Sequence, residues 1–245
     1  CRALGARVCA EDPNCWQIEG VAGRPQAASG PVDVGNSGTT LFLAMTAAAL
    51  AQGTTLFTGD EQTQRRPAGP LLNALRSLGA TAYSVRRNGC APLVVRGPMR
   101  GGTVSIECPT SQYLSSLLLS CPLAEGDSEI VVPLLNEKPY VAMTCAWLRE
   151  MGIQFDASED LQHFHVPGGQ RYPAFQKAIP ADFSSATFFL VAAALTGSEL
   201  FLSGLDMNDT QGDKAVVGMM EQMGCVVTCE QQGIRIKGPE RLRGC

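Results

Sequence analysis

The sequence has little of what marks several common classes of protein. It has two histidines, His163 and His165, and none of its ten cysteines forms a Cys-x-x-Cys pair, so neither a zinc site nor a disulfide scaffold is indicated. The cysteines are irregularly spaced, which favours reduced thiols in a cytoplasmic protein. Positive charge is not in excess either. With a formal net charge of −4, a nucleic-acid partner would lack its usual electrostatic driving force.

Long apolar runs are also missing. The most apolar stretch, around Leu190–Leu195, is interrupted by Thr187, Thr196 and Gly197, and it is shorter than the ~20 residues that a membrane helix needs. We therefore expect no membrane segment, and the first residues do not predict a secretory signal. Gly-x-Gly-x-x-Gly, Gly-x4-Gly-Lys-Ser/Thr and Gly-x-Ser-x-Gly patterns are absent too, which argues against Rossmann, P-loop and serine-hydrolase sites.

An internal repeat is the strongest positive feature of the sequence. Amphipathic helical patterns end at four glycines spaced 74, 73 and 72 residues apart, namely Gly5, Gly79, Gly152 and Gly224. Each glycine is predicted to adopt the left-handed conformation that ends a helix. A pair of short strands should follow each one. The turn glycines that close these pairs are Gly20, Gly97, Gly168 and Gly238.

The segments between these turns share a start rich in Ser and Thr, an apolar helix and an apolar strand. Each repeat therefore predicts the order β-α-β-α-β-β, and three copies cover about residues 21–97, 98–168 and 169–238. Residues 2–20 have the pattern of the tail of an earlier copy, so we expect further sequence upstream. The predicted core positions include Leu41, Leu75, Leu118, Leu148 and Leu190.

The first helix of each repeat begins with small polar residues. Backbone N–H groups at a helix start, beside small hydroxyl side chains, can hold an anion. The same residues are also ordinary N-caps, and that alternative remains open. Arg65 and Arg66 precede Pro67, which suits the first position of a helix. Either arginine can bind a carboxylate or phosphate in a bidentate manner, or lie in solvent as a surface residue.

Several short segments in register with the repeat carry a resemblance to a known family. They are Gly35–Thr40, Arg65–Pro67, Pro109–Leu114, Lys138–Tyr140, Asp182–Ala186 and Gln211–Asp213. Their order and spacing resemble those of the EPSP synthases, which are 3-phosphoshikimate 1-carboxyvinyltransferases, over almost the whole chain.

The resemblance implies an α/β (α+β) fold, an inside-out α/β barrel of repeated β-α-β-α-β-β units in pseudo-threefold domains. Residues 1–168 would form most of the first domain, and residues 169–245 the first unit of the second. Members of the family transfer the enolpyruvyl group of phosphoenolpyruvate to the 5-hydroxyl of shikimate 3-phosphate and release phosphate through a tetrahedral ketal. The resemblance implies no metal and no organic cofactor.

The resemblance also implies roles for individual residues. Thr110 and Ser111 would bind the phosphate of shikimate 3-phosphate, with Gln112 along its ring and Tyr140 completing that pocket. Three further residues would bind phosphoenolpyruvate, where glyphosate competes in sensitive members: Asn36, Gly38 and Arg66. Asp182 would support the catalytic site without being the group that transfers the proton.

The chain departs from the family pattern in ways that leave alternatives open. Phe42 stands where the family usually has Arg. Glu137 stands where a small hydroxyl residue usually contacts the substrate phosphate, and two negative groups repel each other there. The Lys-Ser pair, the catalytic Asp and the Lys-Glu motif of the family have no counterpart, so the rest of a parent chain is an expected partner. Two alternatives to an EPSP synthase therefore remain: a carboxyvinyltransferase that acts on another substrate, and a non-catalytic three-repeat domain that binds phosphorylated ligands.

Overall fold

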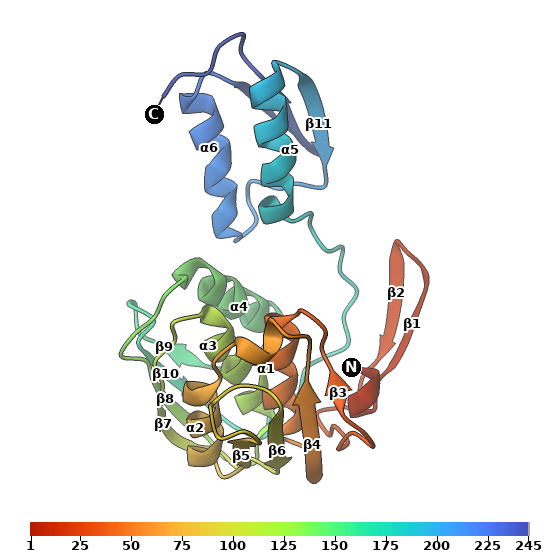
Figure 1. The fold of residues 1–245 in the computed structure, drawn as a ribbon, viewed down its shortest axis with the longest axis vertical. Helices are drawn as coiled ribbons and strands as arrows, with labels where there is room; N and C mark the ends of the chain where they lie inside the picture. Colours follow the sequence, from red (N-terminus) through yellow and green to blue (C-terminus); the bar gives the residue numbers. More distant parts are fainter. Residues whose placement is uncertain (245) are drawn as a thin grey trace. The chain divides into compact units, whose positions relative to one another are not determined.

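The computed structural model describes residues 1–244 and divides the chain into two compact units (Figure 1). They are Cys1–Pro173 and Ala174–Cys245, and each has a hydrophobic core of its own. The boundary between the units follows Pro173. The assignment of residues 1–168 and 169–245 to two domains of the family remains a prediction.

Two successive repeats of the first unit have the predicted order of elements. The first contains β3 (Val32–Asp33), α1 (Gly38–Ala48), β4 (Gly53–Thr58), α2 (Gly69–Ser77), β5 (Thr81–Ser84) and β6 (Leu93–Gly97). The second contains β7 (Gly102–Ser105), α3 (Ser111–Ser120), β8 (Ser128–Val131), α4 (Lys138–Glu150), β9 (Asp156–Ala157) and β10 (His163–Val166). Their sheets have equivalent orders, β3-β4-β6-β5 and β7-β8-β10-β9, with one parallel pair at the β3 or β7 edge and antiparallel pairs elsewhere.

The third repeat lacks the first strand that the sequence pattern predicts. Its elements are α5 (Phe183–Thr196), β11 (Glu199–Ser203), α6 (Ala215–Gln222), β12 (Val226–Glu230) and β13 (Gly233–Lys237). These strands form a sheet in the order β11-β13-β12. Where the missing strand would pair with β11, the Ala181 N–H donates a backbone hydrogen bond to the Gly204 carbonyl at 2.9 Å.

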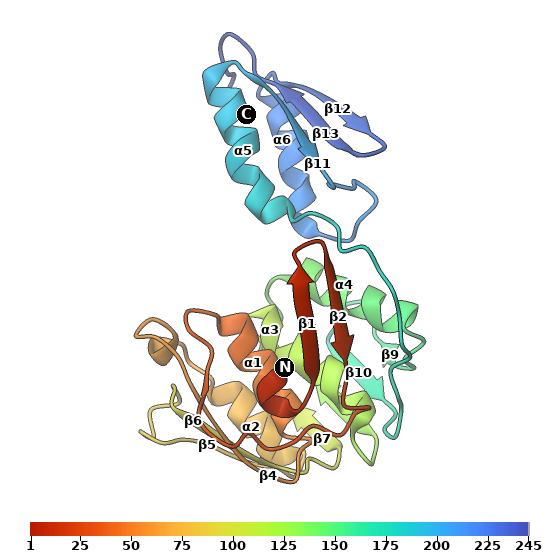
Figure 2. The ribbon, with the colours of Figure 1, turned by 90° about the vertical axis from the view of Figure 1, so that its right-hand side faces the viewer.

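The chain begins with a hairpin that matches the tail of a repeat. A short 3-10 helix (Arg2–Leu4) precedes β1 (Arg7–Asp12) and β2 (Cys15–Glu19), which lie side by side and antiparallel in Figure 2. Most of the hairpin is exposed, including Trp16.

The helix-ending glycines confirm the repeat that the sequence predicts. All four have a positive φ, which is 100° at Gly5, 94° at Gly79, 72° at Gly152 and 98° at Gly224. A side chain other than glycine is disfavoured in that region, which explains why the same residue recurs at the end of each helix.

Three of the four turn glycines have a different physical role, which is close approach. A Cβ atom on Gly97 would lie 2.2 Å from the Ala49 carbonyl oxygen at the end of α1. On Gly238 it would lie 2.2 Å from the Ala193 carbonyl oxygen of α5, and on Gly168 it would lie 2.4 Å from the Gly126 carbonyl oxygen. Nothing lies within 4 Å of a Cβ atom on Gly20.

The leucines that the sequence assigns to the core are all buried. Leu41, Leu75, Leu118, Leu148 and Leu190 are each at most 1% exposed. In the first unit α3 packs against both α1 and α4, so these three helices lie together and the sheets lie outside them (Figure 1).

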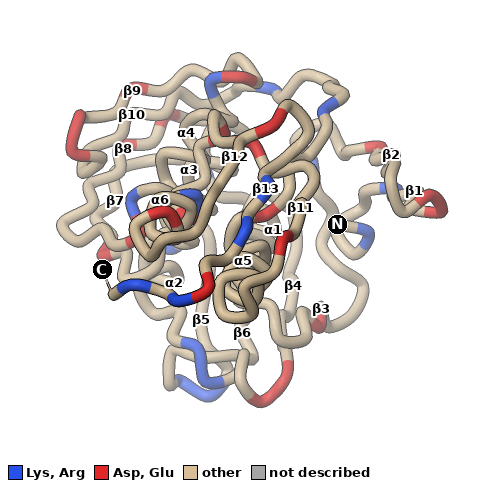
Figure 3. The backbone as a smooth tube through the Cα atoms, turned by 90° about the horizontal axis from the view of Figure 1, so that it is seen from above, with Lys and Arg blue, Asp and Glu red and all other residues tan. Residues whose placement is uncertain are grey.

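Figure 3 shows acidic and basic residues distributed over many elements of the chain. Within residues 1–244, no helix combines the length and the apolar character needed to cross a membrane.

We predict that Gly238→Ala destabilises the second unit by roughly 1–3 kcal/mol, because the new methyl group collides with backbone that cannot move aside. The matched control is Gly218→Ala in α6, where nothing lies within 4 Å of the new atom. That change should stabilise the helix by about 0.5–1 kcal/mol. Urea unfolding followed by far-UV circular dichroism measures both effects, and equal midpoints for the two variants would contradict the prediction.

Candidate functional site

An arginine in the segment before α2, Arg66, lies against the start of α1. A Cβ atom on Gly38, the first residue of α1, would lie 2.6 Å from Nη1 of Arg66. The guanidinium therefore lies directly against the helix start, in room that a glycine leaves free. Arg66 is exposed, and within residues 1–244 its guanidinium has no hydrogen bond or ion pair. Arg65, in contrast, forms an ion pair with Glu61.

Hydrogen bonds between two loops hold this arginine segment in place. The Gly35 carbonyl accepts from the Asp60 N–H at 3.0 Å and from the Thr63 hydroxyl at 2.8 Å. The Asn36 amide donates to the Gln62 side chain at 3.1 Å. Asn36 therefore orients the loop that leads to Arg66.

The start of α3 lies next to the start of α1. Thr110 is the N-cap of α3, and its hydroxyl accepts from the Gln112 N–H at 3.4 Å. The Gln112 side-chain amide donates to the Thr39 hydroxyl in the first turn of α1 at 2.8 Å. This bond joins the two helix starts that the resemblance assigns to different substrates. Nothing in the sequence pattern marks Thr39 as the partner of Gln112, although Thr39 lies within the Gly35–Thr40 motif.

Glu137 brings a negative charge to the start of α3. One carboxylate oxygen, Oε2, accepts from the Ser111 N–H at 3.0 Å, from the Ser111 hydroxyl at 2.9 Å and from the Thr110 hydroxyl at 3.4 Å. Ser111 itself is 3% exposed. The two hydroxyls therefore already have an anionic partner from within the chain.

Tyr140 lies close to this contact along the chain. It is in the first turn of α4, it is 37% exposed, and its backbone N–H donates to the Glu137 carbonyl at 3.1 Å. The Tyr140 carbonyl accepts from the Thr144 hydroxyl at 3.1 Å. Thr144 in turn hydrogen-bonds Ser115 of α3 at 2.7 Å, so α4 is fixed beside α3 near the candidate site.

Phe42 lies in the core of the first unit. It is 3% exposed, and its ring packs edge to face against Tyr113 of α3 with the centroids 4.9 Å apart. The Tyr113 hydroxyl donates to the Pro67 carbonyl, next to Arg66, and burial raises the pKa of Tyr113 to about 12. Phe42 thus contacts the aromatic side chain that links α3 to the arginine segment. The sequence marked it as a departure from the family, and the aromatic pair was not foreseen.

Asp182 belongs to the second unit and caps α5. Its carboxylate accepts from the Ser184 N–H and the Ser185 N–H, each at 3.0 Å, and from the Ser185 hydroxyl at 2.5 Å. The Ser185 hydroxyl is the main cause that lowers the pKa of Asp182, with the two backbone N–H groups adding to it. The Gln211 side chain holds the residues on either side, since it accepts from the Phe183 N–H and donates to the Ala181 carbonyl, each at 2.9 Å.

The predicted site residues therefore fall into two groups. The first unit contains seven of them: Asn36, Gly38, Arg66, Thr110, Ser111, Gln112 and Tyr140. Asp182 lies in the second unit. The roles of all eight in binding or catalysis remain predictions.

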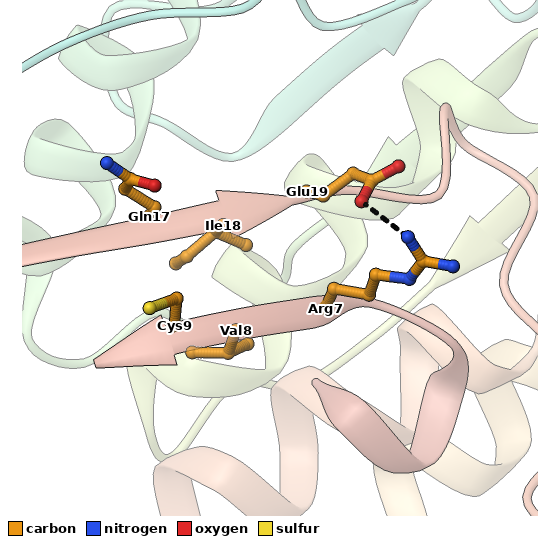
Figure 4. Close-up of a pocket in the computed structure, with 6 residues that line it drawn as sticks. All are labelled: Arg7, Val8, Cys9, Gln17, Ile18 and Glu19. Carbon is orange, nitrogen blue, oxygen red and sulfur yellow. Dashed lines mark hydrogen bonds and ion pairs between the residues drawn. The ribbon is translucent and has the colours of Figure 1, made fainter. Parts of the chain in front are cut away.

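Surface hollows are found in both units of the described chain. One lies over the hairpin and is lined by Arg7, Val8, Cys9, Gln17, Ile18 and Glu19. Figure 4 shows Arg7 and Glu19 turned toward each other across the two strands, where they form an ion pair at 3.3 Å. A second hollow lies between the Gly204–Asn208 and Cys229–Ile234 segments of the second unit. No predicted site residue lines either hollow.

A repeated β-α-β-α-β-β fold, in which polar helix starts lie beside an arginine that forms no ion pair within residues 1–244, defines an α/β protein with a candidate anion site. The whole chain, residues 1–245, matches the family model of EPSP synthase (3-phosphoshikimate 1-carboxyvinyltransferase). The chain belongs to the EPSP synthase family.

Relatives and solved structures agree with this assignment. The 3-phosphoshikimate 1-carboxyvinyltransferase of Acetivibrio thermocellus is 50% identical over 98% of the chain, and that of Ruminiclostridium cellulolyticum is 44% identical over the whole chain. The structure of EPSP synthase from Acinetobacter baumannii matches with a TM-score of 0.78 at 26% identity, over the whole chain. The chain spans 56–57% of the length of these proteins.

We predict that Asp182→Ala destabilises the second unit by about 0.5–2 kcal/mol at neutral pH, the usual cost of losing an N-cap. Asp182→Asn keeps a capping oxygen and should cost less. The pKa of Asp182 is lower in the folded chain than in the unfolded chain. Its contribution to the free energy of unfolding is therefore fully present above the unfolded pKa, near pH ~4, and is lost as the pH falls through the folded pKa. The stability that Asp182→Ala loses at neutral pH should accordingly shrink in acid.

Hydrogen exchange of the α5 amides measures this effect locally. Both tryptophans, Trp16 and Trp147, lie in the first unit, so their fluorescence is an internal control that should not change. Equal α5 protection in Asp182→Ala and the unchanged chain would contradict the prediction.

Proposed function

We propose that the chain is part of an enzyme that transfers the enolpyruvyl group of phosphoenolpyruvate to the 5-hydroxyl of shikimate 3-phosphate. The name shared by the relatives supports this activity, and two of them are 44% and 50% identical to the chain. In the reaction the 5-hydroxyl gives up its proton and its oxygen bonds to C2 of phosphoenolpyruvate, while C3 takes up a proton and becomes a methyl group. Loss of one proton from this methyl group and of phosphate from C2 then gives the enol ether.

The observation that carries the proposal is the junction of the two helix starts with Arg66. The 2.8 Å hydrogen bond from Gln112 to Thr39 holds the starts of α1 and α3 together, and in the described part of the chain the Arg66 guanidinium lies against Gly38 with no hydrogen bond or ion pair of its own. Two anionic substrates that must react with each other need adjacent binding groups of this kind.

Within this proposal the residues have distinct tasks. Arg66 binds the carboxylate or phosphate of phosphoenolpyruvate, and Gly38 keeps the helix start open beside it. Thr110 and Ser111 bind the phosphate of shikimate 3-phosphate through their hydroxyls and the backbone of α3. Gln112 lies along the shikimate ring, at the boundary between the two substrates.

Three further elements complete the proposal. Asn36 holds the loop before Arg66, Tyr140 closes the shikimate pocket, and Asp182 has the supporting role that the resemblance to the family implies. We further propose a cytoplasmic location, on the pattern of cysteine use, and the remainder of a longer chain as the partner that completes the active site.

We predict that the 245-residue chain alone shows no measurable carboxyvinyl transfer. It spans 56% of the Acetivibrio thermocellus enzyme, and the acid and base groups that the family uses have no counterpart in it. Proton transfer contributes roughly 10²–10⁴-fold and electrostatic stabilisation a comparable factor, so losing both removes the activity. A phosphate-release assay, with the complete Acetivibrio enzyme as positive control, measures this. Turnover by the purified chain, absent from an Arg66→Ala preparation made in parallel, would overturn the prediction.

We also predict weak binding of shikimate 3-phosphate to the chain, with a dissociation constant of roughly 1 mM. Ser111→Ala should weaken it at least tenfold, because a hydrogen bond to a charged group contributes about 1.5–3 kcal/mol. Ser105→Ala, on β7, is the matched control and should bind as the unchanged chain does. Ligand-observed NMR titrations measure all three, and equal affinities for the two variants would argue against this subsite.

A further inference from the structure

The start of α3 already holds an anion, and that anion is part of the chain. Glu137 Oε2 accepts from three donors of two adjacent residues, the Ser111 N–H, the Ser111 hydroxyl and the Thr110 hydroxyl. In the part of the chain that the structure describes, no Lys or Arg forms an ion pair with Glu137. Its charge is therefore stabilised at this place by the hydrogen bonds and by the positive end of α3.

The backbone around Glu137 fixes it beside Ser111. Glu137 has φ of +56°, a left-handed conformation that turns the chain sharply before α4. Just before it, the Asn136 N–H donates to the Cys108 carbonyl at 3.1 Å, and the Cys108 N–H donates to the Leu134 carbonyl at 2.8 Å. The segment that carries Glu137 is thus tied to the segment that leads into α3.

These donors cannot serve two anions at once. A single N–H and two hydroxyl hydrogens are aimed at the Glu137 carboxylate, and a ligand phosphate at the same place would need the same hydrogens. It would also meet a like charge in the immediate vicinity. Since Ser111 is 3% exposed, a phosphate reaches its hydroxyl only after neighbouring groups have moved.

We propose that Glu137 is a specificity-determining residue, an internal anion that occupies the phosphate subsite of α3 and that a phosphorylated ligand must displace. This inference rests on the proposed function, which assigns that subsite to the phosphate of shikimate 3-phosphate. It goes further in naming the residue that limits affinity there. The site discriminates against phosphorylated ligands and leaves a ligand without a phosphate unaffected.

The test uses two substitutions of Glu137 in the 245-residue chain. Glu137→Gln removes the charge and keeps the length of the side chain, and Glu137→Ser removes both. Glu107→Gln is the matched control, because Glu107 is exposed, lies in the same unit and, among residues 1–244, forms no hydrogen bond with Thr110 or Ser111. Inorganic phosphate, shikimate 3-phosphate and unphosphorylated shikimate are the probes, titrated by calorimetry or ligand-observed NMR.

The expected result is at least tenfold tighter binding of both phosphate probes to Glu137→Gln and Glu137→Ser, with shikimate and the Glu107→Gln control unchanged. A tenfold gain corresponds to about 1.4 kcal/mol. The gain should disappear when Ser111→Ala is added to Glu137→Gln. A larger gain in the Ser variant than in the Gln variant also supports the proposal, and assigns part of the competition to the space that the side chain fills.

Two other outcomes overturn the proposal, and they separate it from the proposed function. If both Glu137 variants bind phosphate as the unchanged chain does, while Ser111→Ala alone loses binding, the subsite stands and the competing role of Glu137 is wrong. If no variant binds either phosphate probe, both the subsite and the role of Glu137 are wrong. Circular dichroism of each variant shows that the comparison is made on folded protein.

Discussion

The packing of α1 against α3 is the contact on which the candidate site depends. These two helices start side by side because their apolar faces are buried together, with Leu41 and Leu118 both fully covered. A buried hydrogen bond from the Thr46 hydroxyl to the Ser116 hydroxyl, at 3.0 Å, fixes their relative register. That register allows Gln112 to reach Thr39. A slide of one helix along the other would separate the two proposed subsites.

The arginine segment depends on the same packing through Tyr113. The ring of Tyr113 contacts Phe42 of α1, and its hydroxyl donates to the Pro67 carbonyl directly after Arg66. One aromatic side chain therefore connects both helices with the loop that positions the guanidinium. Phe42 contributes apolar surface to this connection, where an arginine would have brought a charge that burial disfavours. The departure from the family pattern is thus accommodated by packing.

The sequence predicted those features that depend on local backbone geometry and on periodicity. Left-handed residues at helix ends need glycine, so Gly79 and Gly152 marked the repeat correctly. The close approach of Gly97 to Ala49 could not be predicted, because it depends on the distance between two segments of the fold. The hydrogen bonds of Glu137 escaped prediction for a related reason. They join residues 26 apart through a left-handed turn at a residue that rarely adopts one.

The three equivalent helix starts show how one repeat produces different electrostatic environments. In α5 the cap is itself an anion, Asp182, which takes two backbone donors and the Ser185 hydroxyl. In α3 the cap is neutral, but Glu137 supplies the negative charge from the next segment of the repeat. In α1 the cap is the neutral Ser37, and the neighbouring charge is the positive Arg66. Ordinary capping therefore operates at all three starts, and α1 is the one whose surroundings favour an external anion without first displacing an internal one.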